Sequence, residues 1–275
     1  MEDCSAAGTS GELVEAALRS LHVCGFVALQ SIFTPALVSA LAASYAALRP
    51  DELPQAPLLN GRLEQILPFQ PPFIDWLLEK QLPALWPLVT GYLGDAIDLD
   101  ALTVVRAPAP TEMQQWHRDV MEGPGATLTV HVPLSEIPKQ SGGALALQPA
   151  THLSDGRECN ATSQQMQPHV PLGSAIVYDA RACHCGTANT LTPAGRPILY
   201  LLLRRRGKYY TGYESFRIRL RFGATGLVTV QRYRDAFRRW RGEAGDRNCE
   251  TANASLHTVA VPLDEGRPWY LRPEA

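Results

Sequence analysis

The sequence predicts a mainly β fold with flanking helices, in which a helical N-terminal third packs against a β core. Residues 10–95 hold apolar side chains at helical spacing. From about 96 to 225, short β-type runs recur, each bounded by Gly, Pro or Asn. No helical pattern separates these runs, which is typical of a sandwich or barrel. With 275 residues, 45% hydrophobic and 19% charged, we expect a single globular domain, 1–275, with a large core.

The N-terminal third is expected to give helical support to the β core. Thr34 and Pro35 predict a helix start, because a hydroxyl suits the N-cap and proline suits the first helical position. Arg49-Pro50 would end that helix. The predicted elements are a helix over 10–21, a strand over 25–29, a helix over 34–49, a long connection over 50–72 and a helix over 73–93 broken near its prolines.

The β core is predicted from runs rich in β-branched and aliphatic residues. A C-terminal basic strand and helix, 214–241, follow this core and are expected to dock on it. The predicted strands are 101–106, 127–134, 144–148, 174–178, 197–204 and 216–222, and the last helix spans about 230–241.

The C-terminal segment is strongly basic, although the whole chain carries a net charge of only −2. Residues 203–241 hold twelve basic and two acidic side chains. In a strand, Arg217, Arg219 and Arg221 would line one face. Such a row could bind an anionic substrate or an acidic partner, but solvated arginines are the more common case. We expect a small-molecule substrate, and this row favours an anionic one. We do not expect nucleic acid as a partner, because the aromatic residues among these arginines fit core packing as well as base stacking.

The cysteines and the N-terminus bear on the cellular compartment. The six cysteines are dispersed without a CxxC pair, which favours reduced thiols over a disulfide framework. The acidic start has neither the basic nor the apolar region of a secretory signal, and no apolar run approaches the length of a membrane span. We therefore expect a cytoplasmic protein.

A set of possible metal ligands lies in the β half. In an extended segment His117 and Asp119 face the same way, so both can bind one metal while Arg118 points away. His184, after the strand predicted at 174–178, supplies a third ligand. One carboxylate and two imidazoles form the facial triad of non-heme iron(II) sites. Cys183 and Cys185 suggest zinc instead, but alternation in an extended segment would put them opposite His184.

A His-x-Asp pair alone is weak evidence, because surface or core histidines are common. The ordered series His117, Asp119, His184 and then Arg196, each tied to a β run, is what favours a functional site. An arginine after the second histidine suits a dicarboxylic co-substrate. The other histidines lack such a pattern and are interpreted as structural or surface residues.

With these motifs the chain resembles the phytanoyl-CoA dioxygenase-like iron(II)/2-oxoglutarate oxygenases over about residues 20–205. The resemblance implies a double-stranded β-helix, a jelly-roll or cupin-like barrel. It implies Fe(II) bound by His117, Asp119 and His184, and 2-oxoglutarate bound by Arg196, with O2 as the second co-substrate. A glutamine before the His-x-Asp pair contacts 2-oxoglutarate in some relatives, so Gln114 or Gln115 is a candidate. The matching stretches are 25–27, 114–119, 132–136, 141–145, 148–152, 179–184 with Asn189, and Arg196.

The function implied is oxidation of a small molecule, most simply hydroxylation, with release of succinate and CO2. Desaturation, epoxidation and ring formation are alternatives at the same iron. Asp119 argues against halogenation, because related halogenases have a small residue there. Ile198 stands where many members have Ser or Thr, which leaves one contact to the 2-oxoglutarate tail unassigned. A non-enzymatic binding protein with a vestigial site is the remaining alternative, and the intact triad and arginine speak against it.

Overall fold

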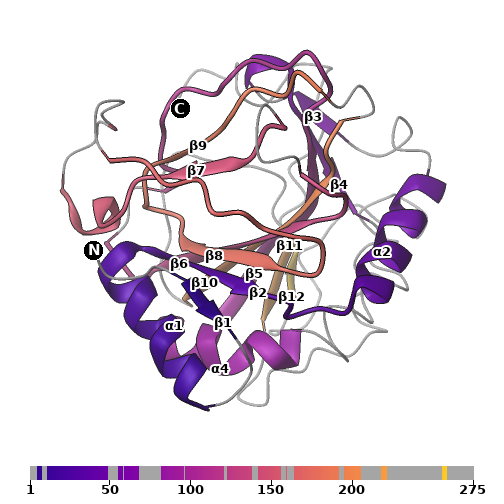
Figure 1. The fold of residues 1–275 in the computed structure, drawn as a ribbon. Helices are drawn as coiled ribbons and strands as arrows, with labels where there is room; N and C mark the ends of the chain where they lie inside the picture. Colours follow the sequence, from indigo (N-terminus) through magenta and orange to yellow (C-terminus); the bar gives the residue numbers. More distant parts are fainter. Residues whose placement is uncertain are drawn as a thin grey trace.

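The computed structural model describes most of the N-terminal two hundred residues and two short segments beyond them. Figure 1 shows two β-sheets, with helices packed on one face of the larger sheet. The described residues are 5–7, 11–48, 55–57, 59–67, 82–95, 97–120, 123–137, 142–155, 159, 164–191, 195–205, 218–221 and 256–258.

The elements follow one another in a β-rich order. The α-helices are α1 (Gly11–Cys24), α2 (Pro35–Ala47) and α4 (Leu82–Leu93), and the 3-10 turns are η2 (Leu59–Gly61) and η4 (Thr151–Leu153). The strands are β1 (Ser5–Ala7), β2 (Phe26–Gln30), β3 (Gln55–Pro57), β4 (Leu63–Ile66), β5 (Ile97–Arg106), β6 (Thr127–Pro133), β7 (Leu145–Leu147), β8 (Ala175–Asp179), β9 (His184–Gly186), β10 (Ile198–Arg205), β11 (Ile218–Arg221) and β12 (Leu256–Thr258).

The larger sheet runs in the order β1-β2-β8-β6-β10-β5-β11-β12, with the β3–β4 hairpin attached to β5. The smaller sheet pairs β7 with β9. Strand β10 lies between β6 and β5 and is antiparallel to both, so Tyr200 stands opposite His131 on one side and Thr103 on the other. This register brings alternate side chains of three strands together on one face of the sheet.

The two faces of the larger sheet have different roles. On β6, Leu128, Val130 and Val132 belong to the main core with residues of α1, α2 and α4. Because side chains alternate along a strand, Thr129 and His131 face the other way, towards the small sheet. The helices therefore stabilise one face by apolar burial and leave the opposite face free to carry polar residues.

The N-terminal third agrees only partly with the prediction. Helices α1 and α2 and strand β2 lie where they were expected, and Thr34 Oγ1 caps α2 by accepting a hydrogen bond from the Leu37 N–H (3.4 Å). However, the predicted connection 50–72 contains β3, η2 and β4. Strand β4 was missed because its central residues, Glu64 and Gln65, are both polar and buried, which removes the alternation that marks a half-buried strand. The described residues of this third include the strands β1 to β4, so it is not helical throughout.

The predicted β runs are confirmed as β5, β6, β7, β8 and β10, and β11 lies within the predicted strand 216–222. Among the described residues the hydrogen-bonded strands form an open sheet and a separate pair, and no single closed barrel. The side chains of the Arg217, Arg219 and Arg221 row, and the helix predicted at 230–241, lie outside what the structure describes. No helix in the described part of the chain is both long and apolar enough to span a membrane.

Candidate metal centre

The two predicted histidine ligands lie side by side because their backbones are paired. The His117 N–H donates to the His184 carbonyl (3.0 Å), and the His184 N–H donates to the His117 carbonyl (2.9 Å). Residues directly opposite in an antiparallel bridge point to the same side, and the two rings are 4.4 Å apart between centroids. Asp119 lies on the same side as His117, as the two-residue spacing predicted. The three potential ligand atoms lie within 4.8 Å of one another.

Hydrogen bonds orient all three side chains towards one point. His117 Nδ1 bonds the Gln115 carbonyl (2.8 Å), and His184 Nδ1 bonds the Ala182 carbonyl (2.9 Å). A carbonyl can only accept, so each Nδ1 carries the proton and each Nε2 keeps its lone pair for a metal. The two Nε2 atoms lie 3.7 Å and 3.4 Å from Asp119 Oδ1. Two imidazole nitrogens and a carboxylate oxygen on one side of an ion suit ferrous iron.

Electrostatics keep Asp119 ready to bind a cation. Burial alone would raise the pKa of its carboxyl, but the neighbouring His184 and His117 and a hydrogen bond from Tyr200 hold that pKa below the usual range. Conversely, burial would lower the pKa of His184, and the Asp119 carboxylate raises it above the usual value. The carboxylate therefore favours a proton on His184, and a metal ion can take the place of that proton.

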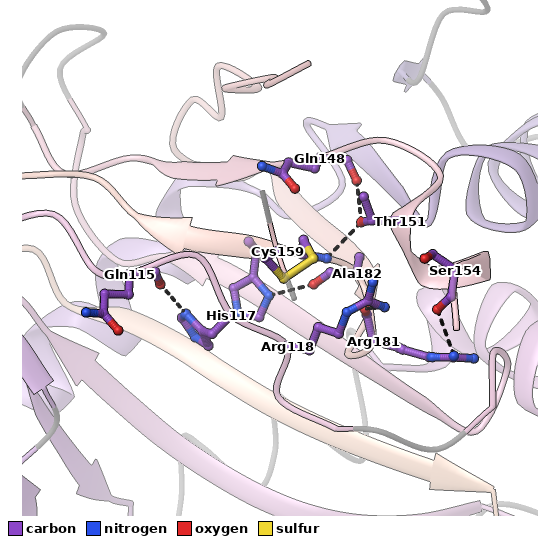
Figure 2. Close-up of a disulfide and its surroundings, with 11 residues drawn as sticks. Gln115, His117, Arg118, Gln148, Thr151, Ser154, Cys159, Arg181 and Ala182 are labelled. Atoms are coloured by element: carbon purple, nitrogen blue, oxygen red, sulfur yellow. Dashed lines mark hydrogen bonds between the residues drawn. A yellow bond between two sulfur atoms is a disulfide. The ribbon is translucent and has the colours of Figure 1, made fainter. Parts of the chain in front are cut away.

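Other residues of the motif have structural roles. Arg118 points away from the site, as predicted, and donates to the Arg181 carbonyl (2.8 Å). Gln114 Oε1 accepts the Gly186 N–H (2.8 Å), which directs this side chain towards β9. Gln115 is exposed, and its contact with His117 is made by its backbone carbonyl (Figure 2).

The cysteines beside His184 do not belong to the ligand cluster found among the described residues. Cys183 forms a disulfide with Cys159, and Cys24 is also disulfide-bonded. The expectation of reduced cysteines is therefore wrong in this structure. The two cysteines have a sequence separation of 24, and the sequence contains no spacing motif that signals their pairing. Cys185 is free and buried.

The disulfide lies in a segment held by several hydrogen bonds (Figure 2). Thr151 Oγ1 donates to the Gln148 carbonyl (2.7 Å) and accepts the Cys183 N–H (2.9 Å). Arg181 Nη2 donates to the Ser154 carbonyl (2.8 Å). These contacts fix the backbone that leads directly into His184.

Arg196 is a buried cation without a full set of partners. The residue is 5% exposed, and among the described residues its Nε and Nη1 have no hydrogen-bond partner. A Cβ at Gly143 would lie 2.4 Å from Arg196 Nε, so a glycine, here with a φ of 73°, is needed for this close approach. Burial, and then the charge of Arg62, lowers the pKa of Arg196 to about 9. A dicarboxylic ligand would supply the missing anion.

Sequence reasoning missed Arg62, the second buried arginine of this region. Its guanidinium donates to the carbonyls of Glu112 (2.7 Å), Gly186 (2.9 Å) and Thr187 (2.9 Å). It therefore holds β9 against the segment that precedes His117. Arg62 lies in the stretch predicted to be a loose connection, and no local pattern distinguished it.

A group of polar residues on the inner face of the larger sheet was also missed. Tyr200 Oη donates to Asp119 Oδ2 (2.7 Å), and Thr103 Oγ1 donates to Glu64 Oε1 (3.1 Å). Burial, opposed by the Thr103 hydrogen bond, raises the pKa of Glu64 to about 7. The alternation in Thr127-Leu-Thr-Val-His131 was a signal for an inner polar face, because the apolar residues point to the helices.

Comparisons with known proteins identify the fold. No family model and no curated protein matches the chain. Among solved structures, it is similar to the non-heme alpha ketoglutarate dependent epimerase SnoN from nogalamycin biosynthesis (TM-score 0.60, 17% identity, 71% of this chain and 84% of SnoN covered). It is also similar to the carbocyclase SnoK from the same biosynthesis (0.58, 17%, 72% and 86%) and to AviO1 from Streptomyces viridochromogenes Tue57 (0.56, 18%, 71% and 96%).

SnoN has also been solved in complex with Fe3+, alpha ketoglutarate and nogalamycin RO. That structure matches 74% of this chain with a TM-score of 0.61 at 16% identity. Alpha ketoglutarate is another name for 2-oxoglutarate. At such identities the likeness concerns the fold. The chain therefore has the β-rich fold of the non-heme alpha-ketoglutarate-dependent enzymes SnoN and SnoK.

Proposed function

We propose that the chain is a non-heme iron(II)- and 2-oxoglutarate-dependent oxygenase that oxidises a small molecule and releases succinate and CO2. The observation that carries this proposal is the convergence of His117, Asp119 and His184 on one point, with both Nδ1 atoms bonded to carbonyls. The double-stranded β-helix of the phytanoyl-CoA dioxygenase-like enzymes is the finer fold that we assign. The two sheets of that fold would correspond to the pair of β7 with β9 and to the larger sheet.

In this proposal the protein residues bind and orient. His117, His184 and Asp119 hold Fe(II), and Arg196 pairs with the distal carboxylate of 2-oxoglutarate. Of the two glutamines, we assign Gln114 to the co-substrate side, because it is directed towards β9 and Gln115 is exposed. Iron with bound 2-oxoglutarate and O2 supplies the oxidising power. The buried inner face, with Tyr200 and Glu64 on it, keeps water away and fixes the position of Asp119.

Hydroxylation is the outcome we expect, and an anionic small molecule is the substrate that the basic C-terminal segment favours. The names of SnoN, an epimerase, and SnoK, a carbocyclase, favour one second candidate: ring formation or another non-hydroxylating oxidation at the same iron. Product analysis with one active substrate separates the two, because hydroxylation adds an oxygen atom from O2 and ring closure by removal of hydrogen adds none.

The proposal is tested by anaerobic titration of the protein with Fe(II) and 2-oxoglutarate. Chelation of iron by the keto acid gives a visible charge-transfer band. We expect this band in the wild-type protein and not in His184→Ala, with Cys185→Ser as a control at the next residue of the same strand. If the wild-type protein develops no band, or His184→Ala keeps it, the proposal is wrong. A binding protein with a vestigial site would give no band even with excess Fe(II) and 2-oxoglutarate.

A further inference from the structure

His131 stands beside the candidate co-substrate site on the inner face of β6. The residue is 8% exposed. It lies opposite Tyr200 in the strand register, and the two rings meet edge to face at 6.5 Å between centroids. Since Tyr200 bonds Asp119, the His131 ring is held on the same surface as the metal ligands. It was interpreted from the sequence as a structural or surface residue.

The charges around His131 come from the site. Burial, followed by the charges of Arg196 and His184, lowers the pKa of His131 to about 3. The imidazole is therefore neutral at neutral pH, with one ring nitrogen that donates and one that accepts. A neutral donor beside a guanidinium adds a hydrogen bond for an anion without adding repulsion between two cations.

A cavity of about 200 Å³ adjoins His131 and reaches the residue next to Gly143, which packs against Arg196. His131 lines it, and so does Ala144, which follows the glycine that packs against Arg196. Its other polar side chains, Gln167 and His169, are exposed at the rim. The remaining lining residues are apolar, namely Pro133, Ile137, Leu145, Pro168, Val170 and Ile176. Among the polar side chains of this lining, His131 is the buried one, so it is the donor that a carboxylate held between the cavity and Arg196 would meet.

Ile198 leaves a place for this second donor. It is buried and aliphatic, so it offers no hydroxyl two residues after Arg196. We propose that His131 donates a hydrogen bond to the distal carboxylate of 2-oxoglutarate beside Arg196, and so takes the part that a hydroxyl at position 198 would play. This inference rests on the proposed function and names a binding residue for its co-substrate.

The test compares two 2-oxo acids in the anaerobic iron titration. 2-Oxovalerate has a methyl group where 2-oxoglutarate has its distal carboxylate, while both chelate iron through the same keto acid end. We expect His131→Leu to lower the affinity for 2-oxoglutarate about 10- to 100-fold, which is the effect of losing a hydrogen bond to a charged group. The affinity for 2-oxovalerate should stay unchanged. His131→Gln, which retains an N–H donor, should recover most of the affinity for 2-oxoglutarate.

Val132→Ala is the matched control, since Val132 is the next residue of β6 and packs in the core on the opposite face. It should not distinguish the two acids. The inference is overturned if His131→Leu weakens both acids equally, or neither. A wild-type protein that gives no band with either acid refutes the proposed function instead, so the two failures can be told apart.

Discussion

The phenol of Tyr200 donates a hydrogen bond to Asp119 Oδ2 at 2.7 Å, which leaves Oδ1 as the carboxylate oxygen nearest both histidines. A ligand carboxylate held in this way does not need to be reoriented when a metal binds. Tyr200 lies on β10 within the larger sheet, and Asp119 lies outside the strands of that sheet. The larger sheet therefore holds the Asp119 carboxylate in place through Tyr200. If the proposed iron binds here, this relationship makes Tyr200 a positioning residue for it.

Tyr200→Phe should therefore weaken Fe(II) binding by about 10-fold or more, because Asp119 loses the bond that orients it. Competition with a metal chelator under anaerobic conditions measures this. Tyr92→Phe is a matched control, since Tyr92 Oη makes the same kind of bond to Asp179 Oδ2 (2.7 Å). Equal iron affinities in the two variants would contradict a positioning role for Tyr200.

Arg196→Met should have two effects of opposite sign. Removing a buried cation without a full set of partners should raise the stability of the ligand-free protein, while the affinity for 2-oxoglutarate should fall by about 30-fold or more. Thermal unfolding and titration measure the two effects. Arg62→Met is the comparison, because it leaves without their donor three carbonyls that Arg62 now bonds. This variant should only lower the stability of the protein. A less stable Arg196→Met protein would show that Arg196 holds the fold together.

Glu64 should make stability fall as pH rises. Burial raises its pKa from 4.5 to about 7, so the folded protein holds this proton more tightly than the unfolded chain does. The stabilisation is fully present below pH 4.5 and is lost as the pH rises towards 7. Glu64→Gln cannot ionise, so its stability relative to wild type should rise over this range by about 2–4 kcal/mol. Denaturant unfolding at several pH values tests this, and a difference independent of pH would contradict it.

The Cys159–Cys183 disulfide should stabilise the fold beside the metal site. It closes a loop with a sequence separation of 24, for which chain entropy predicts about 3 kcal/mol. Cys159→Ser should lower the free energy of unfolding by about that amount. Cys185→Ser is the control, because it removes a thiol outside any disulfide and therefore leaves the cross-link intact. Peptide mapping without reductant checks the pairing. Recovery of free Cys159 and Cys183 from the folded protein would contradict it.

Part of the candidate site could be predicted from local rules. The spacing of His117 and Asp119 places both on one side of an extended segment, and alternation explains Arg118. For these residues the deciding geometry spans only two or three positions. His184 was expected from its place in the motif series, and in the structure it joins the other two through a backbone bridge to His117.

The residues that were missed depend on contacts between distant segments. Glu64 and Arg62 reach the site only because β4 pairs with β5, and His131 gains its position from the register of β6 and β10. Cys159 pairs with Cys183 at a sequence separation of 24. Such pairings depend on tertiary packing, which overrides the local pattern that marked 50–72 as a connection.

The most direct test of the central claim is a crystal structure of the protein grown anaerobically with Fe(II) and 2-oxoglutarate, with anomalous diffraction recorded at the iron edge. We predict one iron bonded to His117 Nε2, His184 Nε2 and an oxygen of Asp119, with the distal carboxylate of 2-oxoglutarate against Arg196. Iron bound elsewhere, or 2-oxoglutarate absent from the Arg196 side of a loaded metal, would contradict the account.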